Sequence, residues 1–303
     1  MSAAFSQAIP VRENHWRIYL MVFAITVLWA GNFIAVKFAI SEMPPLLAMG
    51  FRTLAAGILM IPIFASARRS DTEKRSLKTD FWLLAALGIG GITLNQLFFT
   101  LALERTSVAH GSLIISTTPI SILLLASLIK QEHLTTRKIA GMVLALSGVA
   151  VIQLTPDKAG GATLFGDLLA MCGSLTFAAF TVFGKQITSR HKSITINAFA
   201  YFGGALLLLP IVFWLGGGMD LASLSTRAWM AIAYMALFPS VICYVGYFHA
   251  LNYVSASRVA VFAYLQPGIA TFMAVPLLGE SISSTLILGG CIALFGVAIT
   301  QRG

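Results

Sequence analysis

Residues 102–153 of this chain return, in altered form, as residues 250–301. The two stretches align without a gap across 52 positions, and 14 of the aligned pairs are identical, among them Pro119 with Pro267. Several identical pairs are prolines and glycines, which act on backbone geometry rather than on packing alone. Self-similarity at a constant offset indicates an internal duplication, so the chain is predicted to fold as two related units.

The composition favours a membrane over water as the surrounding solvent. Of the 303 residues, 58% are hydrophobic and only 10% are charged, whereas soluble domains carry about 25% charged residues. The net charge of +9 would suit a nucleic-acid-binding protein if the chain were soluble. Here the basic residues lie in short loops between apolar runs, so we expect a lipid bilayer and no nucleic acid as partner.

Ten apolar runs have about the 20 residues that a membrane-spanning helix needs. They cover residues 17–39, 45–67, 81–103, 107–129, 139–155, 167–187, 195–216, 228–250, 256–278 and 284–301. With the N-terminus inside, 15 Lys and Arg residues fall on the inner side and four on the outer side. Inner loops are rich in Lys and Arg, so both termini are predicted to be cytoplasmic.

Each repeat contains five of these spans, an odd number, so the second copy must enter the membrane from the opposite side. We assign residues 1–155 to the first repeat and residues 156–303 to the second, inverted repeat. Glu132 then lies inside and Glu280 outside, where we expect them to tie the starts of spans five and ten. The predicted fold is an all-α integral membrane protein with ten transmembrane helices, as two inverted five-helix repeats around a central cavity.

One pattern occurs twice: Ala-Leu, small residues, a mid-helix proline and a glutamate at the helix end. It reads Ala102-Leu103…Pro119…Glu132 and Ala250-Leu251…Pro267…Glu280, and it is accompanied by Trp29, Asn32-Phe33 and Lys37 in span one and by Arg52 in span two. In these residues the chain resembles the ten-helix EamA-type branch of the drug/metabolite transporter superfamily.

The resemblance implies a multi-pass carrier of the bacterial inner (plasma) membrane that moves amino acids, other metabolites or drugs. Within that family we favour an amino-acid exporter of the YddG-like kind that prefers aromatic or hydrophobic substrates. Exporters of drugs and of nucleotide- or sugar-type metabolites are the alternative; phosphates would call for several midplane cations, and only Arg52 approaches that. The expected mechanism is alternating access, in which the two halves rock around one midplane site.

Three prolines mark candidate kinks and gates. Pro119 and Pro267 lie near the middle of spans four and nine, and Pro239 lies near mid-depth in span eight. A proline inside a helix leaves one carbonyl without its partner, and that carbonyl can face a cavity or bond to neighbours. Polar residues crowd the same turns, so we predict that Thr117, Tyr264 and Gln266 face the cavity. The alternative is a purely structural kink.

Other polar residues lie within the apolar spans. Asn32 is in span one, Asn95 and Gln96 are in span three, and Arg52 is the only charge well inside a span. Polar groups in hydrocarbon are unfavourable unless they find partners, so these four are candidate substrate-binding residues. The alternatives are bonds between helices for the amides and, for Arg52, extension of its side chain to the outer interface.

Aromatic residues in the spans could line an apolar pocket that holds a few fixed polar groups. We predict that Trp29, Phe99, Phe177 and Tyr244 belong to it, with packing or lipid contact as the alternative. Tyr244 corresponds to Gln96 at the repeat offset of 148 residues, so polar groups recur at matching depth.

Several activities are disfavoured by what the spans do not contain. All 11 acidic residues lie in loops or at span ends, so we expect a facilitator or exchanger rather than a midplane carboxylate proton relay. The five histidines are scattered and no HExxH or GxSxG pattern occurs, which argues against a membrane-embedded enzyme. We therefore expect no enzymatic activity, no cofactor and no metal. The partner is a small-molecule substrate, and the protein is expected to act as a monomer.

Overall fold

The computed structural model of the chain describes residues 15–67, 71–129, 134–153, 163–188, 190–254, 259 and 261–302, and every regular element in these ranges is helical. The elements of the first repeat are α1 (His15–Ile40), α2 (Pro45–Ser66), α3 (Asp71–Leu87), η1 (Gly88–Thr93), α4 (Leu94–Arg105), α5 (Val108–Ile115), α6 (Thr118–Leu128) and α7 (Thr136–Gln153). Those that follow are α8 (Leu164–Ile187), α9 (Ser193–Gly217), η2 (Leu221–Ser223), α10 (Thr226–Met235), η3 (Ala236–Cys243), α11 (Tyr244–Leu251), η4 (Val261–Tyr264), α13 (Leu265–Leu278) and α14 (Ser284–Arg302).

These elements confirm the predicted ten-helix membrane fold. The segments α3-η1-α4 and α10-η3-α11 are each one span, as are α5 with α6 and η4 with α13. Seven helical segments of the described chain are long and apolar enough to cross a membrane by themselves, whereas 262–278 and 284–300 are shorter apolar helices. The boundary expected between residues 155 and 156 lies outside the described residues.

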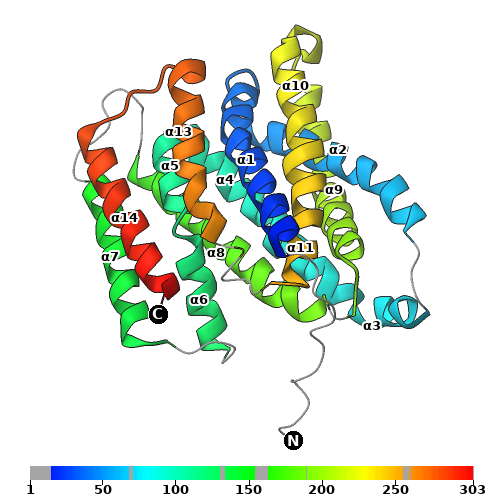
Figure 1. Cartoon of the computed structure of the whole chain (residues 1–303). Helices are drawn as coiled ribbons and strands as arrows, with labels where there is room; N and C mark the ends of the chain where they lie inside the picture. The colour runs from blue at the N-terminus through cyan, green and yellow to red at the C-terminus, as the bar shows by residue number, and fades with distance from the viewer. Residues whose placement is uncertain are drawn as a thin grey trace, which may run out of the picture.

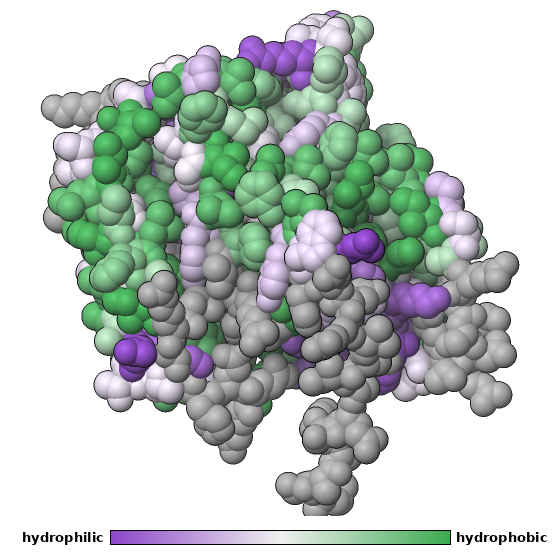
Figure 2. Space-filling model, in the orientation of Figure 1, coloured by the Kyte–Doolittle hydropathy of each residue, from purple (hydrophilic) through white to green (hydrophobic). Residues whose placement is uncertain are grey.

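The outer surface of the bundle is apolar. Figure 2 shows hydrophobic side chains over most of the visible face, with hydrophilic ones gathered mainly toward its upper and lower margins. Large apolar side chains point outward, including Trp82, Trp214 and Phe272, whose exposed fractions are 80%, 85% and 82%. So much exposed apolar surface would be unfavourable in water, and it fits a bundle surrounded by lipid.

The last helices of the two repeats pack against each other. In Figure 1, α7 and α14 lie side by side and run in opposite directions, as an inverted repeat requires. Their backbones touch at glycines: a Cβ added to Gly148 would lie 2.3 Å from the Ala293 nitrogen, and one added to Gly296 would lie 2.3 Å from the Ala145 nitrogen. Small residues allow this close approach, which explains why these glycines occur in both copies.

The two halves also interleave elsewhere. The equivalent helices α2 and α9 pack together, α4 packs on α8, and α1 packs on α10 and α13. A packed apolar cluster joins α1, α2, α4, α5, α10 and α13 around Ala39, Val108 and Ala274. Because helices from one repeat lie between helices of the other, any space at the centre of the bundle has walls from both repeats.

Spans three and eight share a feature that the sequence did not predict for span three. Each contains a π-helical segment, η1 from Gly88 and η3 from Ala236, and these starting positions are 148 residues apart. We expected a kink at Pro239, and the segment around it is π-helical. The equivalent position in span three is Gly91, so a π-helical segment forms there without a proline. A Cβ added to Gly91 would lie 2.4 Å from the Phe180 Cβ, so close packing against α8 accompanies η1. Such segments frequently occur at functional sites.

Spans four and nine are interrupted near their prolines. In span four, α5 ends at Ile115 and α6 begins at Thr118, so Pro119 lies in the first turn of a new helix. In span nine, the short helix η4 precedes α13, and Pro267 lies in the first turn of α13. The first turn tolerates proline because the N–H groups there have no partner within the helix.

Candidate functional site

A cavity of about 100 Å³, measured as the space open to water centres, lies among spans one, two, three, four, six, eight and nine. That volume has room for several water molecules or part of a small solute. Nine of the eleven residues predicted for substrate binding are on its wall, and Pro119 joins them. The nine are Trp29, Asn32, Arg52, Asn95, Gln96, Phe99, Phe177, Tyr244 and Gln266.

The wall of the cavity follows the internal repeat. Six pairs of lining residues are separated by 148 positions, so each pair comes from equivalent places in the two repeats. These pairs are Thr26 with Ser174, Trp29 with Phe177, Gln96 with Tyr244, Phe99 with Tyr247, Ile115 with Ala263, and Thr118 with Gln266. Equivalent surfaces of the two halves therefore face one shared space, which is the arrangement expected around a pseudo-twofold axis in the membrane plane.

Four aromatic rings form one wall of the cavity. Trp29 contacts Phe177, Tyr244 and Tyr247, with ring centroids 5.8, 5.7 and 5.4 Å apart. Phe177 in turn contacts Tyr244 at 6.2 Å and Tyr247 at 5.4 Å. These spacings and tilted geometries are those of favourable ring pairs. We call Trp29, Phe177, Tyr244 and Tyr247 the aromatic cluster; it offers ring faces and edges to a ligand.

Arg52 reaches the cavity from α2 and does not extend to the outer interface. Its side chain is 3% exposed, and its Nε donates a 2.9 Å hydrogen bond to the Ser240 Oγ in η3. Ser240 donates in turn to the carbonyl of Met235 at 2.7 Å. The Arg52 Nη1 is buried and has no hydrogen-bond partner among the described residues. A buried cationic donor without a partner is unfavourable, so this atom marks a place for an acceptor.

The amide side chains differ in how far the protein satisfies them. Asn95 donates to the Gly173 carbonyl at 2.8 Å and accepts from the Tyr244 hydroxyl at 3.2 Å. Gln96 donates to the Tyr201 hydroxyl at 2.9 Å. The Asn32 Oδ1 is buried without a hydrogen-bond partner among the described residues, although it belongs to the cavity wall. Asn95 and Gln96 therefore also connect helices, and Asn32 keeps an open acceptor.

Two predicted binding residues do not line the cavity. Thr117 sits in the break between α5 and α6, where its hydroxyl donates to the Ile114 carbonyl at 2.7 Å, as expected for a threonine that satisfies a helix end. Tyr264 packs against an apolar cluster around Ile120 and Val297 instead. Pro239 and Pro267 are also absent from the wall. Pro239 still acts next to it, because its carbonyl accepts a 3.3 Å bond from the Trp29 Nε1.

The structure adds wall residues that were not in the predicted set of binding residues. Tyr247 completes the aromatic cluster, and its hydroxyl lies 3.3 Å from the Thr181 hydroxyl. On the wall from spans four and six, the Ser174 hydroxyl donates to the Thr118 hydroxyl at 3.0 Å. The repeat offset was the available signal, because Tyr247, Thr118 and Ser174 correspond to Phe99, Gln266 and Thr26.

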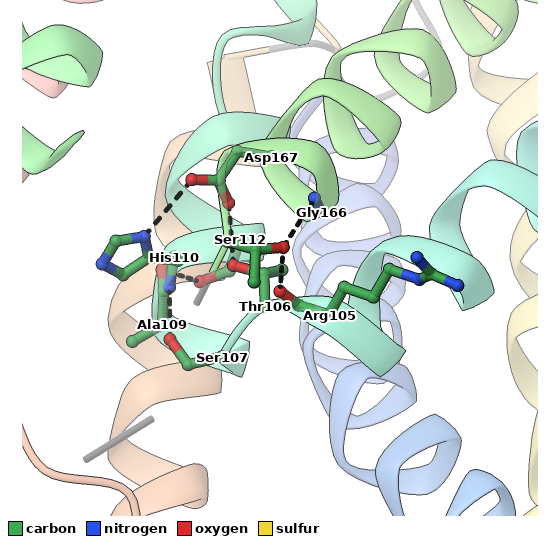
Figure 3. Close-up of polar contacts among 9 residues, drawn as sticks. Arg105, Thr106, Ser107, Ala109, His110, Ser112, Gly166 and Asp167 are labelled. Atoms are coloured by element: carbon green, nitrogen blue, oxygen red, sulfur yellow. Dashed lines mark hydrogen bonds and ion pairs between the residues drawn. The ribbon is translucent and has the colours of Figure 1, made fainter. Parts of the chain in front are cut away.

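One end of the bundle is tied by buried polar contacts. Figure 3 shows Asp167, in the first turn of α8, between Thr106 and His110. Its carboxylate accepts from the Thr106 hydroxyl at 2.7 Å and lies 3.6 Å from the His110 Nδ1. The Lys37 Nζ donates to the Thr106 carbonyl at 2.8 Å. These contacts join spans one, three, four and six at the C-terminal end of α1.

Glu280 belongs to the same end, in a role different from the one we predicted. We expected it to tie the start of span ten, but its carboxylate accepts from the Val108 and Ala109 nitrogens at 2.7 and 3.2 Å. These are the first amides of α5, which have no partner within their own helix and therefore attract a carboxylate. Glu280 thus ties span nine to span four. Glu132 lies outside the described residues.

Comparisons with known proteins agree with this architecture. The model of the EamA-like transporter family matches residues 16–154 and again residues 164–302. An uncharacterized transporter of Archaeoglobus fulgidus is 29% identical over 94% of this chain and 97% of its own length. The uncharacterized inner membrane transporter YedA of Escherichia coli K12 is 25% identical over 93% and 90%. A solved protein crystal structure shares the fold with a TM-score of 0.68 at 18% identity, covering 94% of this chain and 97% of that one.

Proposed function

Since this chain belongs to the EamA-like transporter family, we propose that it is a secondary transporter that exports amino acids, with aromatic or hydrophobic side chains favoured. The observation that carries the proposal is the central cavity, which combines the aromatic cluster with a small number of polar atoms. Small-molecule sites commonly have this composition: mostly apolar walls and a few fixed polar groups that orient the ligand.

Alternating access supplies the mechanism. The six repeat-related pairs on the wall support it, because two equivalent, inverted halves can present one site first to one side and then to the other. The cavity uses α1 only from Val22 to Phe33, whereas Val36 and Ala39 are packed in the apolar cluster. The cavity is therefore closed toward the C-terminal end of α1, where Glu280 and Lys37 also make their contacts. This arrangement fits a state in which a solute enters the cavity from the side of the N-terminal end of α1.

The proposed orientation places both termini in the cytoplasm of a bacterial cell, with the protein in the inner membrane. Its support is the Lys and Arg distribution and the similarity to an inner membrane transporter. An impermeant maleimide should then label Ser41→Cys, but not Thr135→Cys, in intact spheroplasts of a variant without Cys172, Cys243 and Cys291. Labelling of Thr135→Cys alone would reverse the orientation. A monomer suffices, because both repeats that build the cavity are in one chain.

The cavity chemistry favours amino acids over the phosphate-bearing alternatives. Among the residues described on the wall, Arg52 is the only charged side chain. A nucleotide or sugar phosphate carries at least two negative charges and calls for several cationic partners. A neutral drug would leave the Arg52 guanidinium without a counter-charge. An amino acid with an apolar side chain supplies one carboxylate and one surface for the aromatic cluster.

The test is transport by the purified protein in proteoliposomes. Vesicles are loaded with one labelled solute at a time from a panel of amino acids, nucleosides, nucleotide sugars and cationic dyes, and efflux is followed with and without a pH gradient. We expect efflux of amino acids with aromatic or branched apolar side chains above that of empty liposomes. Efflux of dyes or nucleotide sugars, with no efflux of any amino acid, would refute the proposed substrate class.

A further inference from the structure

We infer that the Arg52 Nη1 and the Asn32 Oδ1 form a clamp for the charged head group of an α-amino acid, holding its carboxylate and its ammonium respectively. The inference rests on the proposed function and specifies the chemistry of recognition at the same cavity. It predicts that a substrate must carry both a free carboxylate and a free amino group, whatever its side chain.

The carboxylate side of the clamp follows from the bonding of Arg52. One of its donors, Nε, is engaged by Ser240, which holds the guanidinium plane in place. Arg52 lines the cavity, and its Nη1 donor is buried without a hydrogen-bond partner among the described residues. No Asp or Glu is among the described wall residues, so the protein provides no counter-charge from the wall itself. A solute carboxylate would provide both the missing acceptor and the missing charge.

The ammonium side follows from the chemistry of Asn32. Asn32 is 6% exposed and lines the cavity, and its carbonyl oxygen Oδ1, which can only accept, is buried without a hydrogen-bond partner among the described residues. An ammonium group has three donors and no acceptor, so it complements this oxygen.

Two hydrogen bonds relate α1 and α2 to neighbouring residues of η3. Trp29 donates to the Pro239 carbonyl, and the next residue, Ser240, accepts from Arg52. Asn32 lies three residues after Trp29 in α1, on the same helix face and about 4.5 Å farther along the axis at 1.5 Å per residue. Arg52 and Asn32 therefore lie on two helices, α2 and α1, that both pack against η3. A solute held by both would extend its side chain toward the aromatic cluster, of which Trp29 is a member.

The first experiment needs no variant. In proteoliposomes, the transported amino acid of highest affinity is competed with its own amide, which lacks the carboxylate, and with its N-acetyl derivative, which lacks the ammonium. We expect each derivative to compete at least about tenfold more weakly than the parent, as for the loss of a hydrogen bond to a charged group. Equal competition by either derivative would overturn the clamp while leaving amino-acid transport established.

Variants then assign each atom to its group. In Arg52→Gln, the affinity ratio of amino acid to amide should fall toward one, while the ratio of amino acid to N-acetyl derivative stays as in wild type. In Asn32→Ala, the second ratio should fall and the first should stay. Lower affinity for every ligand with both ratios unchanged would refute the assignment, because a merely structural role weakens all ligands alike.

Matched controls come from the same chain. Arg227 and Asn252 are exposed and absent from the cavity wall, so Arg227→Gln and Asn252→Ala should leave both ratios unchanged. Arg52→Lys keeps the charge and should keep part of the discrimination against the amide, even if Arg52→Gln fails to fold. If the wild-type protein moves no amino acid at all, the proposed function and the clamp both fail. That outcome differs from transport without head-group discrimination, which removes only the clamp.

Discussion

Trp29 and Phe177 occupy equivalent positions in the two repeats, and their rings meet edge to face, with centroids 5.8 Å apart and planes at 87°. A residue and its own repeat counterpart can touch only where the pseudo-symmetry axis passes between them. Their contact therefore lies on that axis, at the wall of the central cavity. It also shows that the aromatic cluster, although built from two halves, is a single surface.

Substitution of Trp29 should weaken transport according to what it removes. Trp29→Ala removes a ring that a substrate side chain would contact, and one aromatic pair is worth about 0.5–1.5 kcal/mol beyond area burial, so substrate affinity should fall by about tenfold. Trp29→Phe keeps a ring and loses the bond to the Pro239 carbonyl, so its loss should be about threefold. The measurement is KM for amino-acid efflux in proteoliposomes. Trp214→Ala, at a side chain that is 85% exposed, should match wild type; an equal loss there would contradict a specific role for Trp29.

The contact between α7 and α14 should be sensitive to a single methyl group. An added Cβ at Gly148 meets the Ala293 backbone at 2.3 Å, whereas one at Gly268 in α13 meets nothing within 4 Å. Gly148→Ala should lower stability by about 1–3 kcal/mol through overpacking. Gly268→Ala should be neutral or slightly stabilising, because alanine has the higher helix propensity. Thermal unfolding in detergent compares the two; equal melting temperatures would mean that the helices separate easily.

Glu280 should matter as a cap more than as a charge. Glu280→Ala leaves the Val108 and Ala109 amides without their acceptor, and loss of a capping residue lowers stability by about 1 kcal/mol. Glu280→Gln keeps one acceptor oxygen, so we expect an intermediate effect in thermal unfolding. Glu104→Gln serves as the control, because Glu104 makes an exposed ion pair with its neighbour Arg105 and should change stability little. A larger loss for Glu104→Gln would refute this ranking.

The loop between α1 and α2 predicts a pH dependence. The Ser225 hydroxyl donates to the Glu42 carboxylate, with the Ser225 amide adding a second bond, and this holds the Glu42 pKa below its ordinary value of 4.5. A lowered pKa in the folded state means stabilisation that is present above pH 4.5 and lost as the pH falls through the folded-state pKa. The melting temperature of wild type should therefore be higher than that of Glu42→Gln at pH 7, and the difference between the two melting temperatures should shrink below pH 4.5. A difference that grows on acidification would contradict this sign.

Much of the candidate site could be predicted from individual residues. Polar side chains in the middle of apolar spans are unfavourable toward lipid, which is why Asn32, Arg52 and Gln96 were expected in the interior, and all three are buried. That argument does not tell whether a buried side chain lines a cavity or packs against a neighbouring helix. Thr117 and Tyr264 were placed on the wall for the same reason, yet their spans turn them toward a helix end and an apolar cluster.

The repeat, the ten spans and the inverted arrangement followed from the chain alone, because hydrophobic length, loop charge and an odd number of spans per repeat are properties that can be counted along it. The π-helical segments in spans three and eight, the contact of Glu280 with span four and the open atoms of Arg52 and Asn32 did not follow. They depend on which helices become neighbours and at what rotation. In a bundle whose faces are nearly all apolar, periodicity along one helix does not specify its rotation, and packing between helices does.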